Sequence, residues 1–276
     1  MKEILVKKAD GSTEPFKVLK LEHSLERAGA SKSITDKIVK EITSNLVDGM
    51  TTEEIYNKAF LLLKDKEKKP VAAKYSLKKA VFDLGPSGFP FEDFIAEIYK
   101  AKGYKTSTGI ILKGSCAKHE VDLLATNSEG RKYGAEIKFH NRQGIKTDLK
   151  VALYVNSRFN DLTKSGEVDE GILITNTKFT KNVISYGECI GLKMISWNYP
   201  QKDNLYSLIE ETGLHPITCL TTITNQDKRK FFDNEIVLCR DIKENTNLLK
   251  TQGISDKRIP KIIEEASTLC QPGAGV

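Results

Sequence analysis

The chain has 276 residues, of which 39% are hydrophobic, and is long enough to bury the cores of about two domains. Lys and Arg total 43 against 37 Asp and Glu, so the formal charge is +6, which favours a polyanionic partner. No stretch approaches the roughly 20 apolar residues that cross a bilayer, and the N-terminal residues lack the apolar core of a signal peptide. We therefore expect a soluble, cytoplasmic protein with no membrane partner.

Five cysteines are scattered singly along the chain, and none forms a C-x-x-C pair. We expect reduced thiols at all five positions: Cys116, Cys189, Cys219, Cys239 and Cys270. Cys116 and His119 have a metal-like spacing, but a zinc site needs two further ligands. We therefore do not assign a metal to this pair.

Residues 1–88 are expected to form a small domain in which a hairpin precedes several helices. Two short strands within residues 3–19 flank Asp10-Gly11, a dipeptide that supplies the positive φ of a tight turn. Apolar residues at helical spacing then predict helices over four ranges: 19–30, 33–47, 51–66 and 71–84. Thr51 or Thr52 can cap the third helix, ahead of two acids in its first turn. The Gly and Pro cluster at 85–88 marks a domain boundary.

Residues 89–200 predict a mixed sheet with helices on its faces. The pattern opens with a helix over 90–103 that ends at Gly103. Strands are expected at 104–112, 119–126, 132–140, 170–179 and 192–197, with further helices at 148–162 and 181–191. This order predicts a mixed sheet, because one helix is followed by three successive strands and then by alternating helices and strands. The fold class is therefore α/β, in a multi-domain chain.

Three polar side chains interrupt the apolar pattern of two successive strands. Asp122 lies on the strand predicted at 119–126, while Glu136 and Lys138 lie two residues apart on the next one. Side chains two apart on a strand point to the same face, so Glu136 and Lys138 share a face. A charge in an apolar strand costs on the order of several kcal/mol unless it is paired or bound to a metal. If the two strands pair, the three polar groups converge.

These residue types suit metal-dependent hydrolysis of a phosphodiester bond. A cation neutralises charge on the transition state and lowers the pKa of the attacking water. Two carboxylates supply the hard oxygen ligands that Mg²⁺ or Mn²⁺ prefers. Lys138 can orient or deprotonate the water, or stabilise the non-bridging oxygens. The alternative is an ordinary strand whose Glu-Lys pair faces solvent.

Residues 86–200 resemble the Mrr-like restriction endonucleases of the PD-(D/E)xK superfamily. The resemblance lies in the helix FEDFIAEIYKAKGY and in the strands HEVDLL and AEIKFH. It implies that Asp122 and Glu136 are metal ligands and that Lys138 is the catalytic lysine. Glu92, on the leading helix, matches a position that often assists metal binding in the family.

The sequence departs from the family pattern at two points. Val121 stands where the family has the Pro of its Pro-Asp pair. The Gln-rich helix that follows the lysine in the family is also absent, so Gln143 is the nearby candidate for contact with nucleic acid.

Three residues flank this cluster. Strand alternation places Glu120 on the face of Asp122 and His119 on the opposite face, although a bulge would reverse this. We expect a structural role for His119. His140 shares the face of the Glu-Lys pair and is a candidate for contact with a phosphate of the nucleic acid.

Residues 1–88 resemble an ATP-cone, the small regulatory nucleotide-binding domain best known at the front of ribonucleotide reductases. The matching segments recur in order: VKKADGSTEPF, LKLEHSLERAGA, DGMTTEEIY and VAAKYSLKKAVFDLGPSG. The resemblance implies that ATP or dATP binds as a regulatory ligand to Lys7, Lys8, Glu14, Lys20, Thr52, Tyr56 and Lys74. Lysines would hold the triphosphate as point charges, and the helix start at Thr52 would add hydrogen-bond donors.

This region also departs from its family, because Ala9 stands where an Arg or Lys usually precedes Asp-Gly. The chain contains no G-x-x-x-x-G-K-[ST] phosphate loop, so we expect the nucleotide to be sensed rather than hydrolysed. The alternative is a charged hairpin-and-helix domain that binds nothing.

The region 201–276 is helical by pattern. Within it, residues 248–270 resemble a degenerate helix-hairpin-helix, a motif whose exposed amides bind DNA phosphates. Lys257, Arg258 and Lys261 follow Gly253 at a suitable distance and are candidates for contact with nucleic acid. The alternative is a helical cap on the nuclease or a dimerisation element.

These patterns predict three domains, at 1–88, 89–200 and 201–276, in a nucleotide-regulated DNA endonuclease that uses Mg²⁺ or Mn²⁺. Its partners would be DNA, the regulatory nucleotide and further copies of the chain in a homo-oligomer. Two alternatives stay open at this point. One is a nucleotide-responsive DNA-binding protein without cleavage activity, and the other is a nuclease that acts on RNA.

Overall fold

Two compact units make up the part of the chain that the computed structural model describes, which comprises residues 4–66, 69–85, 91–243 and 245–271. Unit 1 contains the described residues up to Ala80 and those from His215 to Cys270. Unit 2 contains the described residues between Val81 and Leu214. The boundary predicted at 85–88 falls on Gly85, in unit 2, and on three residues that lie outside the described ranges.

Unit 1 opens with the predicted hairpin, in which β1 (Leu5–Lys7) and β2 (Thr13–Pro15) pair antiparallel. Gly11 has a φ of 82°, as the expected Asp10-Gly11 turn requires. Three helices follow: α1 (Val18–Arg27), α2 (Lys32–Ser44) and α3 (Thr52–Lys66). Their apolar sides form a core that includes the fully buried Leu25, Ile38 and Leu63.

Thr51 is the residue that caps α3. Its hydroxyl accepts a hydrogen bond from the N–H of Glu54 at 3.1 Å, and the Glu54 carboxylate accepts one from the N–H of Thr51 at 2.8 Å. This reciprocal pair is a capping box. Of the two candidate caps, Thr51 fills the role and Thr52 begins the helix.

The single helix predicted at 71–84 is two helices in the structure, so that expectation was wrong in detail. α4 (Lys69–Tyr75) and α5 (Leu77–Phe82) are separated at Ser76, whose hydroxyl donates to the carbonyl of Ala73 at 2.8 Å. The N–H of Ser76 is shared between the carbonyls of Ala72 and Ala73, each at 3.1 Å, so the helical hydrogen bonds tighten locally at this residue. The apolar spacing runs through both helices, so the pattern alone does not reveal the break.

The C-terminal part of unit 1 is helical, as predicted. It consists of a 3-10 turn η2 (Ile217–Cys219) and four helices: α10 (Asn225–Asp233), α11 (Cys239–Lys243), α12 (Thr246–Thr251) and α13 (Ile259–Leu269). α13 packs against α11 and α4. Thr218 also donates a hydrogen bond to the carbonyl of Ala80 at 2.9 Å. These contacts join the residues after His215 to the N-terminal helices.

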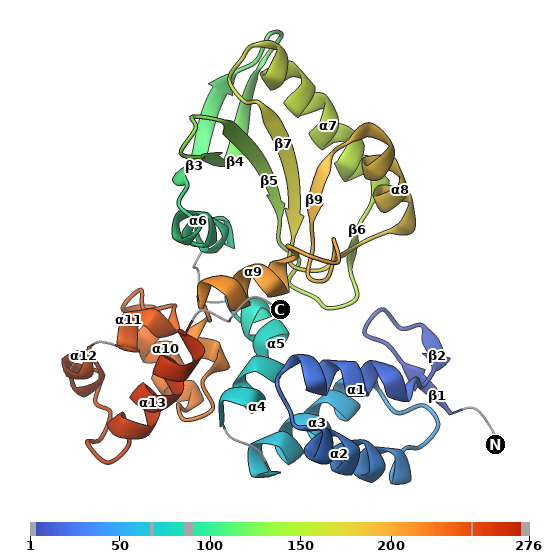
Figure 1. Ribbon diagram of the computed structural model, residues 1–276, viewed down its shortest axis with the longest axis vertical. Coiled ribbons are helices and arrows are strands. Elements are labelled where there is room, and N and C mark those ends of the chain that lie inside the picture. The colour runs from blue at the N-terminus through green and yellow to red at the C-terminus, as the bar shows by residue number, and fades with distance from the viewer. Residues whose placement is uncertain (1–3, 67–68, 86–90, 244, 272–276) are drawn as a thin grey trace. The chain divides into compact units, whose positions relative to one another are not determined.

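Unit 2 is built on a five-stranded mixed sheet with the strand order β3-β4-β5-β7-β9 (Figure 1). The strands are β3 (Lys105–Lys113), β4 (Lys118–Thr126), β5 (Lys132–Lys138), β7 (Glu170–Thr175) and β9 (Lys193–Ile195). β3, β4 and β5 pair antiparallel, while β5, β7 and β9 pair parallel. The predicted mixed sheet is confirmed.

Helices cover both faces of this sheet (Figure 1). They are α6 (Phe91–Ala101), α7 (Leu149–Lys164), α8 (Lys181–Ile190) and α9 (Leu205–Thr212). Gly134 of β5 and Gly171 of β7 are register partners, and a Cβ on either would collide with the ring of Phe159 from α7. These two glycines therefore let α7 pack closely on one face, which we call the α7 face.

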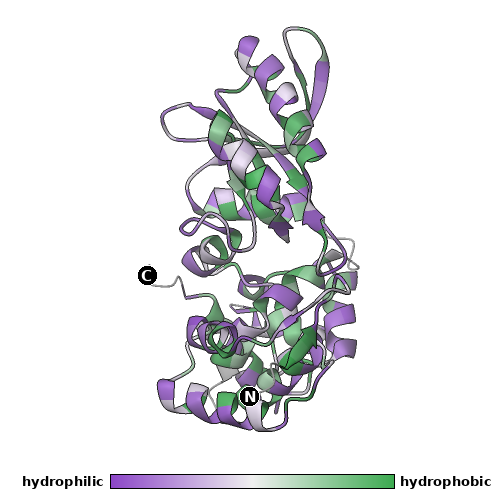
Figure 2. Cartoon of the chain, turned by 90° about the vertical axis from the view of Figure 1, so that its right-hand side faces the viewer, coloured by the Kyte–Doolittle hydropathy of each residue, from purple (hydrophilic) through white to green (hydrophobic). Residues whose placement is uncertain are grey.

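The opposite face, here called the α6 face, carries α6 and α9. Tyr133 alternates with Gly134 and therefore points to this side, where a chain of edge-to-face contacts leads through Tyr104 to Tyr99 of α6. α9 packs against α6. The helices carry both hydrophilic and hydrophobic residues along their ribbons, as amphipathic helices on a sheet must (Figure 2).

The strand predicted at 170–179 is also divided. β7 ends at Thr175, and β8 (Lys178–Phe179) pairs parallel with β6 (Lys146–Thr147) in a separate small sheet. Between them lies Asn176, which is fully buried. Its side chain accepts a hydrogen bond from the N–H of His140 at 2.9 Å and donates one to the carbonyl of His140 at 3.0 Å. Asn176 thereby fixes the backbone directly after β5.

Within the described ranges, no helix combines the length and the apolar character that crossing a bilayer requires. All five cysteines are free thiols, as predicted. Three of them are buried in unit 1: Cys219, Cys239 and Cys270.

Candidate active site

The predicted catalytic strands, β4 and β5, pair from Thr126 and Lys132 to Leu123 and Ala135. Immediately beyond this pairing, the carboxylate of Asp122 accepts a hydrogen bond from the backbone N–H of Ile137 at 2.6 Å. A side chain of β4 thus takes the position of a backbone partner for β5. Asp122 is therefore held beside the segment of β5 that carries the other two predicted residues.

Glu136 and Lys138 point to the α7 face, as alternation from Gly134 requires. Lys138 Nζ lies 2.6 Å from Glu136 Oε1. The Glu136 side chain is 3% exposed, whereas that of Lys138 is 39% exposed. A buried carboxylate is thus paired with an amine that reaches solvent. The structure therefore places Lys138 against Glu136, and Asp122 against the backbone of the same strand.

A fourth residue, Arg158, joins this cluster from α7, and the sequence analysis did not identify it. Its guanidinium forms an ion pair with Glu136 Oε2 and donates to the backbone carbonyl of Glu120 at 2.9 Å. The signal for it is helical spacing, because Arg158 lies three residues after Val155 and four before Leu162, both of which are buried against the sheet. A charged residue at the edge of the apolar side of a helix is expected to pair with an opposite charge on the sheet that the helix covers.

The charges of the cluster balance. Asp122 and Glu136 supply two negative charges, and Lys138 and Arg158 supply two positive charges. The Arg158 side chain is 11% exposed and lies over the ring of Tyr154, with 4.5 Å between its Cζ and the ring centroid. Its Nε is buried without a hydrogen-bond partner, which leaves one donor of the guanidinium unused.

The donor set fits a divalent cation with two protein carboxylates. Mg²⁺ keeps several of its own waters and is commonly bound through one or two carboxylates, so Asp122 and Glu136 suffice. Across the described ranges, no group of three or more His, Cys, Asp or Glu side chains could hold a metal ion. Glu92 lies in the first turn of α6, and the structure does not gather it with the other two acids.

The predicted contacts with nucleic acid in unit 2 lie just after β5. His140 Nε2 lies 3.2 Å from the hydroxyl of Thr147. Burial lowers the pKa of His140, and the charge of Lys138 lowers it further, so the imidazole is neutral at neutral pH. Gln143 lies in an exposed turn. His140 can therefore offer a hydrogen bond to a phosphate, but not a full positive charge.

His119 has a structural environment. Its Nε2 lies 2.8 Å from Asp161 Oδ2. The same carboxylate accepts hydrogen bonds from the N–H groups of Cys116, at 2.8 Å, and Ala117, at 3.2 Å. The hydrogen bond from His119, together with those from the backbone, holds the pKa of Asp161 at about 2. These hydrogen bonds tie the turn between β3 and β4 to α7.

Three of the predicted nucleotide contacts in unit 1 form one cluster between the hairpin and the start of α1. The Glu14 carboxylate lies 2.6 Å from Lys8 Nζ and 2.8 Å from Lys20 Nζ. The hydrogen bond from Lys20, and then that from Lys8, lowers the pKa of Glu14. Lys20 lies in the first turn of α1, where unpaired backbone N–H groups favour an anion.

The other predicted nucleotide contacts lie next to this cluster or along α3 and α4. Lys7 forms an isolated backbone bridge with Thr51, which brings β1 to the start of α3 at Thr52. Tyr56 is one turn further along α3 and stacks on Tyr75 with ring centroids 5.2 Å apart. Lys74 directly precedes Tyr75 in α4. The predicted contacts therefore occupy the hairpin and the facing ends of neighbouring helices.

The candidates in the C-terminal part of unit 1 have different environments. Arg258 Nη2 lies 2.5 Å from Asp227 Oδ2 and donates to the carbonyl of Thr222 at 3.1 Å. Burial acts to raise the pKa of Asp227, but the hydrogen bonds from Arg258 and Thr224 outweigh it, and the pKa is lowered. Arg258 therefore stabilises unit 1 internally. Lys257 and Lys261 are exposed.

Comparisons with known proteins find three family matches along the chain. The ATP cone domain family matches residues 4–80, the restriction endonuclease family matches residues 86–198, and the family described as AF1548-like, C-terminal, matches residues 215–270. An uncharacterized protein of Archaeoglobus fulgidus is 35% identical over 173 residues, which cover 62% of this chain and 97% of that protein. The chain belongs to the AF1548-like family. It carries an ATP cone domain and a restriction-endonuclease-like domain.

Two solved structures resemble this member of the AF1548-like family. The crystal structure of the protein of unknown function AF1548 is 31% identical, with a TM-score of 0.50, and the match covers 70% of this chain and 100% of that chain. A repair endonuclease from Pyrococcus abyssi is 20% identical, with a TM-score of 0.30, over 37% of this chain and 42% of that chain.

Because Arg158 is paired with the buried Glu136, removing its guanidinium should destabilise unit 2. Arg158→Met should lower the free energy of unfolding of unit 2 by about 3 kcal/mol, because it leaves a buried carboxylate with one counter-ion. Adding Glu136→Gln should recover much of this loss, because the uncompensated charge is then gone. Urea unfolding followed by the fluorescence of Trp197, the one tryptophan of the chain, measures both changes.

The exposed Arg142 provides a matched control, and Arg142→Met should change the free energy of unfolding by less than about 0.5 kcal/mol. Strictly additive losses in the double variant would show that the Glu136–Arg158 pair does not couple energetically.

Proposed function

We propose that the chain is a nucleotide-regulated DNA endonuclease that depends on a divalent metal ion and hydrolyses phosphodiester bonds. The observation that carries this proposal is the pairing of Lys138 with the buried Glu136 on β5, with the Asp122 carboxylate held against the backbone of the same strand at the point where β4 and β5 stop pairing. All three lie within the region that matches the restriction endonuclease family. Two acids and an amine at one point suit phosphodiester hydrolysis better than they suit the core of a sheet.

Asp122 and Glu136 would hold the metal ion, Mg²⁺ or Mn²⁺. When bound, the ion supplies positive charge to the transition state and makes a bound water more acidic. The backbone N–H of Ile137 orients the Asp122 carboxylate, and the sheet holds Glu136 on the α7 face. These contacts are made by strands rather than by loops, which keeps the two carboxylates in a fixed relation.

Lys138 is the residue best placed to act on the substrate. Its amine lies 2.6 Å from Glu136 and is partly exposed, so it can contact a group that approaches from solvent. It would orient the attacking water or hold a non-bridging oxygen of the scissile phosphate. Arg158 approaches Glu136 from the α7 side and, together with Lys138, balances the charge of the cluster.

The ATP cone domain would regulate this activity by binding ATP or dATP. Lys8 and Lys20 converge on Glu14 beside the first turn of α1, and each ammonium group retains donors for phosphate oxygens. The absence of a hydrolytic phosphate loop from the sequence indicates that the nucleotide is a signal and not a fuel.

DNA is the substrate that we propose, and the formal charge of +6 supports a polyanionic partner. The exposed Lys257 and Lys261 would add phosphate contacts from unit 1. We also predict that the chain forms a homo-oligomer and that it acts in the cytoplasm.

Cleavage of a supercoiled plasmid tests the nuclease. The wild-type protein should nick or linearise the plasmid with Mg²⁺ or Mn²⁺ and should be inactive with EDTA. Glu136→Gln and Lys138→Met should each lower the rate at least about 100-fold, because each removes a group that acts on the reacting atoms. Glu129→Gln and Lys164→Met alter exposed residues of the same unit and should cut at the wild-type rate.

Other outcomes of this assay would replace the proposal. A mobility shift without cleavage under every condition would make the chain a DNA-binding protein. Cleavage of an RNA of matching sequence, with intact plasmid, would make it a ribonuclease. Equal rates for all four variants would place the active site elsewhere.

Calorimetric titration with ATP and with dATP tests the regulatory site. Lys20→Ala should weaken binding about tenfold, because it removes one charge-assisted contact with the phosphates. Lys37→Ala, an exposed substitution on α2, should leave the isotherm unchanged. An identical isotherm for Lys20→Ala and the wild type would count against this site.

A further inference from the structure

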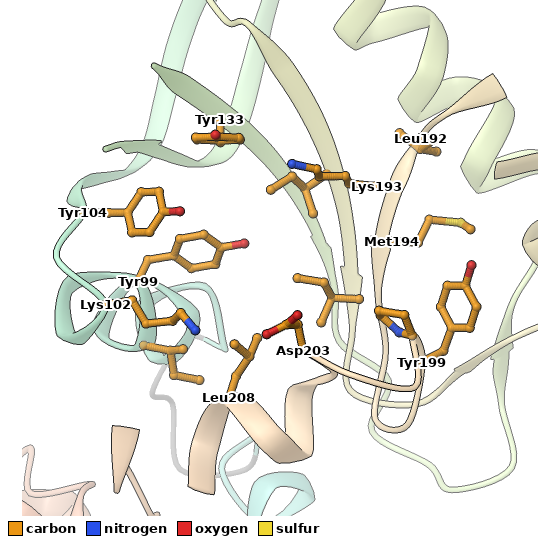
Figure 3. Close-up of a pocket in the computed structure, with 14 residues that line it drawn as sticks. Tyr99, Lys102, Tyr104, Tyr133, Leu192, Lys193, Met194, Tyr199, Asp203 and Leu208 are labelled. Carbon is orange, nitrogen blue, oxygen red and sulfur yellow. The ribbon is translucent and has the colours of Figure 1, made fainter. Parts of the chain in front are cut away.

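A cavity of about 510 Å³ opens on the α6 face of unit 2, away from the catalytic cluster (Figure 3). Its floor is the sheet and its walls are α6 on one side and α9 with the loop before it on the other. The volume lies within the range of roughly 300–1,000 Å³ that is usual for sites that bind small molecules. Most of its lining is apolar, from side chains such as Ile98, Ile172, Ile195 and Leu208.

Polar groups converge on this apolar space from several elements. Figure 3 shows the hydroxyls of Tyr99 and Tyr104 and the carboxylate of Asp203 directed toward the same hollow. Lys102, directly after α6, and Lys193 from β9 complete the set. A mostly apolar cavity with a few convergent polar groups is the usual form of a ligand site.

Two of these groups are positively charged and are held in place by acids. Lys102 Nζ lies 3.0 Å from Glu211, and Lys193 Nζ lies 3.0 Å from Glu170. Each ammonium group has three donors and so retains capacity for a ligand. Lys193 also lies over the ring of Tyr133, with 5.1 Å between its Nζ and the ring centroid.

The tyrosines supply both donors and flat surfaces. Tyr99, Tyr104 and Tyr133 contact one another edge to face, with centroid distances of 5.2 and 5.9 Å. Burial raises the pKa of Tyr99 far above the physiological range, so its hydroxyl keeps its proton. This wall can therefore donate hydrogen bonds and pack against a planar ring.

Asp203 is the acidic group of the cavity. Its φ is 58°, in the left-handed region that residues other than glycine seldom adopt. In this conformation the Asp203 carboxylate is directed into the cavity, as Figure 3 shows. The site thus combines two cations and two hydroxyl donors with one acceptor.

We propose that this cavity binds a free mononucleotide. The aromatic base would lie between the tyrosines and the aliphatic floor, and the phosphate would contact Lys193. Lys102 and Asp203, on the opposite side of the hollow in Figure 3, would form hydrogen bonds with the sugar or the base. The catalytic residues lie on the other face of the sheet, so the ligand is separate from the strand that is cut. The site also lies in unit 2 and is distinct from the nucleotide site proposed in the ATP cone domain.

Tryptophan fluorescence provides a readout confined to unit 2. The chain has a single tryptophan, Trp197, which lies two residues before the cavity residue Tyr199. Titration of the full chain with adenosine, guanosine, cytidine and thymidine 5′-monophosphates should give a saturable change for at least one of them. The matching nucleoside and inorganic phosphate should each bind at least about tenfold more weakly, because each lacks part of the contacts.

Variants then assign the signal to the cavity. Lys193→Met and Asp203→Asn should each weaken binding about tenfold, and asparagine tolerates the left-handed backbone at this position. Lys202→Met, an exposed neighbour outside the cavity, should bind as the wild type does. Lys20→Ala should also leave the titration unchanged, which separates this site from the ATP cone domain.

Three results would overturn the proposal. They are the absence of a saturable change at millimolar mononucleotide, equal affinity for the nucleoside and its monophosphate, and wild-type affinity in both Lys193→Met and Asp203→Asn. Urea unfolding of the variants establishes that any lost binding does not reflect a lost fold.

Discussion

The buried carboxylate of Glu136 is the constraint around which unit 2 is arranged. It lies within a sheet whose neighbouring positions are apolar, and it is stabilised by Lys138 from its own strand and Arg158 from α7. Removing both cations from a site of this burial would be costly, so the close packing of α7 on the sheet matters for the charge as well as for the core. Gly134 and Gly171 make that close packing possible because they leave room for Phe159.

A metal ion at this site would have to compete with Arg158. Glu136 Oε2 is engaged by Arg158, so a cation that binds Glu136 and Asp122 competes with a guanidinium for the same oxygen. Arg158 would then be released from Glu136, and its donors would become available to a phosphate. On this proposal the pair would stabilise the protein before the metal binds.

Much of this was predictable from local patterns. The Asp10-Gly11 turn, the strand alternation of Glu136 and Lys138 and the order of helices and strands each follow from a few neighbouring residues. Features that depend on tertiary contacts were not predictable in this way. Arg158 became a member of the site only through the packing of α7, and the breaks lie at Ser76 and Asn176, whose hydrogen bonds the apolar spacing does not reveal.

The central claim is that Asp122 and Glu136 together hold a divalent cation. Crystals of the protein soaked in Mn²⁺ would test it directly through anomalous scattering from the metal. The account predicts a peak within coordination distance of both carboxylates, with the Arg158 guanidinium displaced from Glu136. A structure in which Mn²⁺ binds elsewhere, or in which Arg158 still contacts Glu136 and no peak lies beside Asp122, would contradict it.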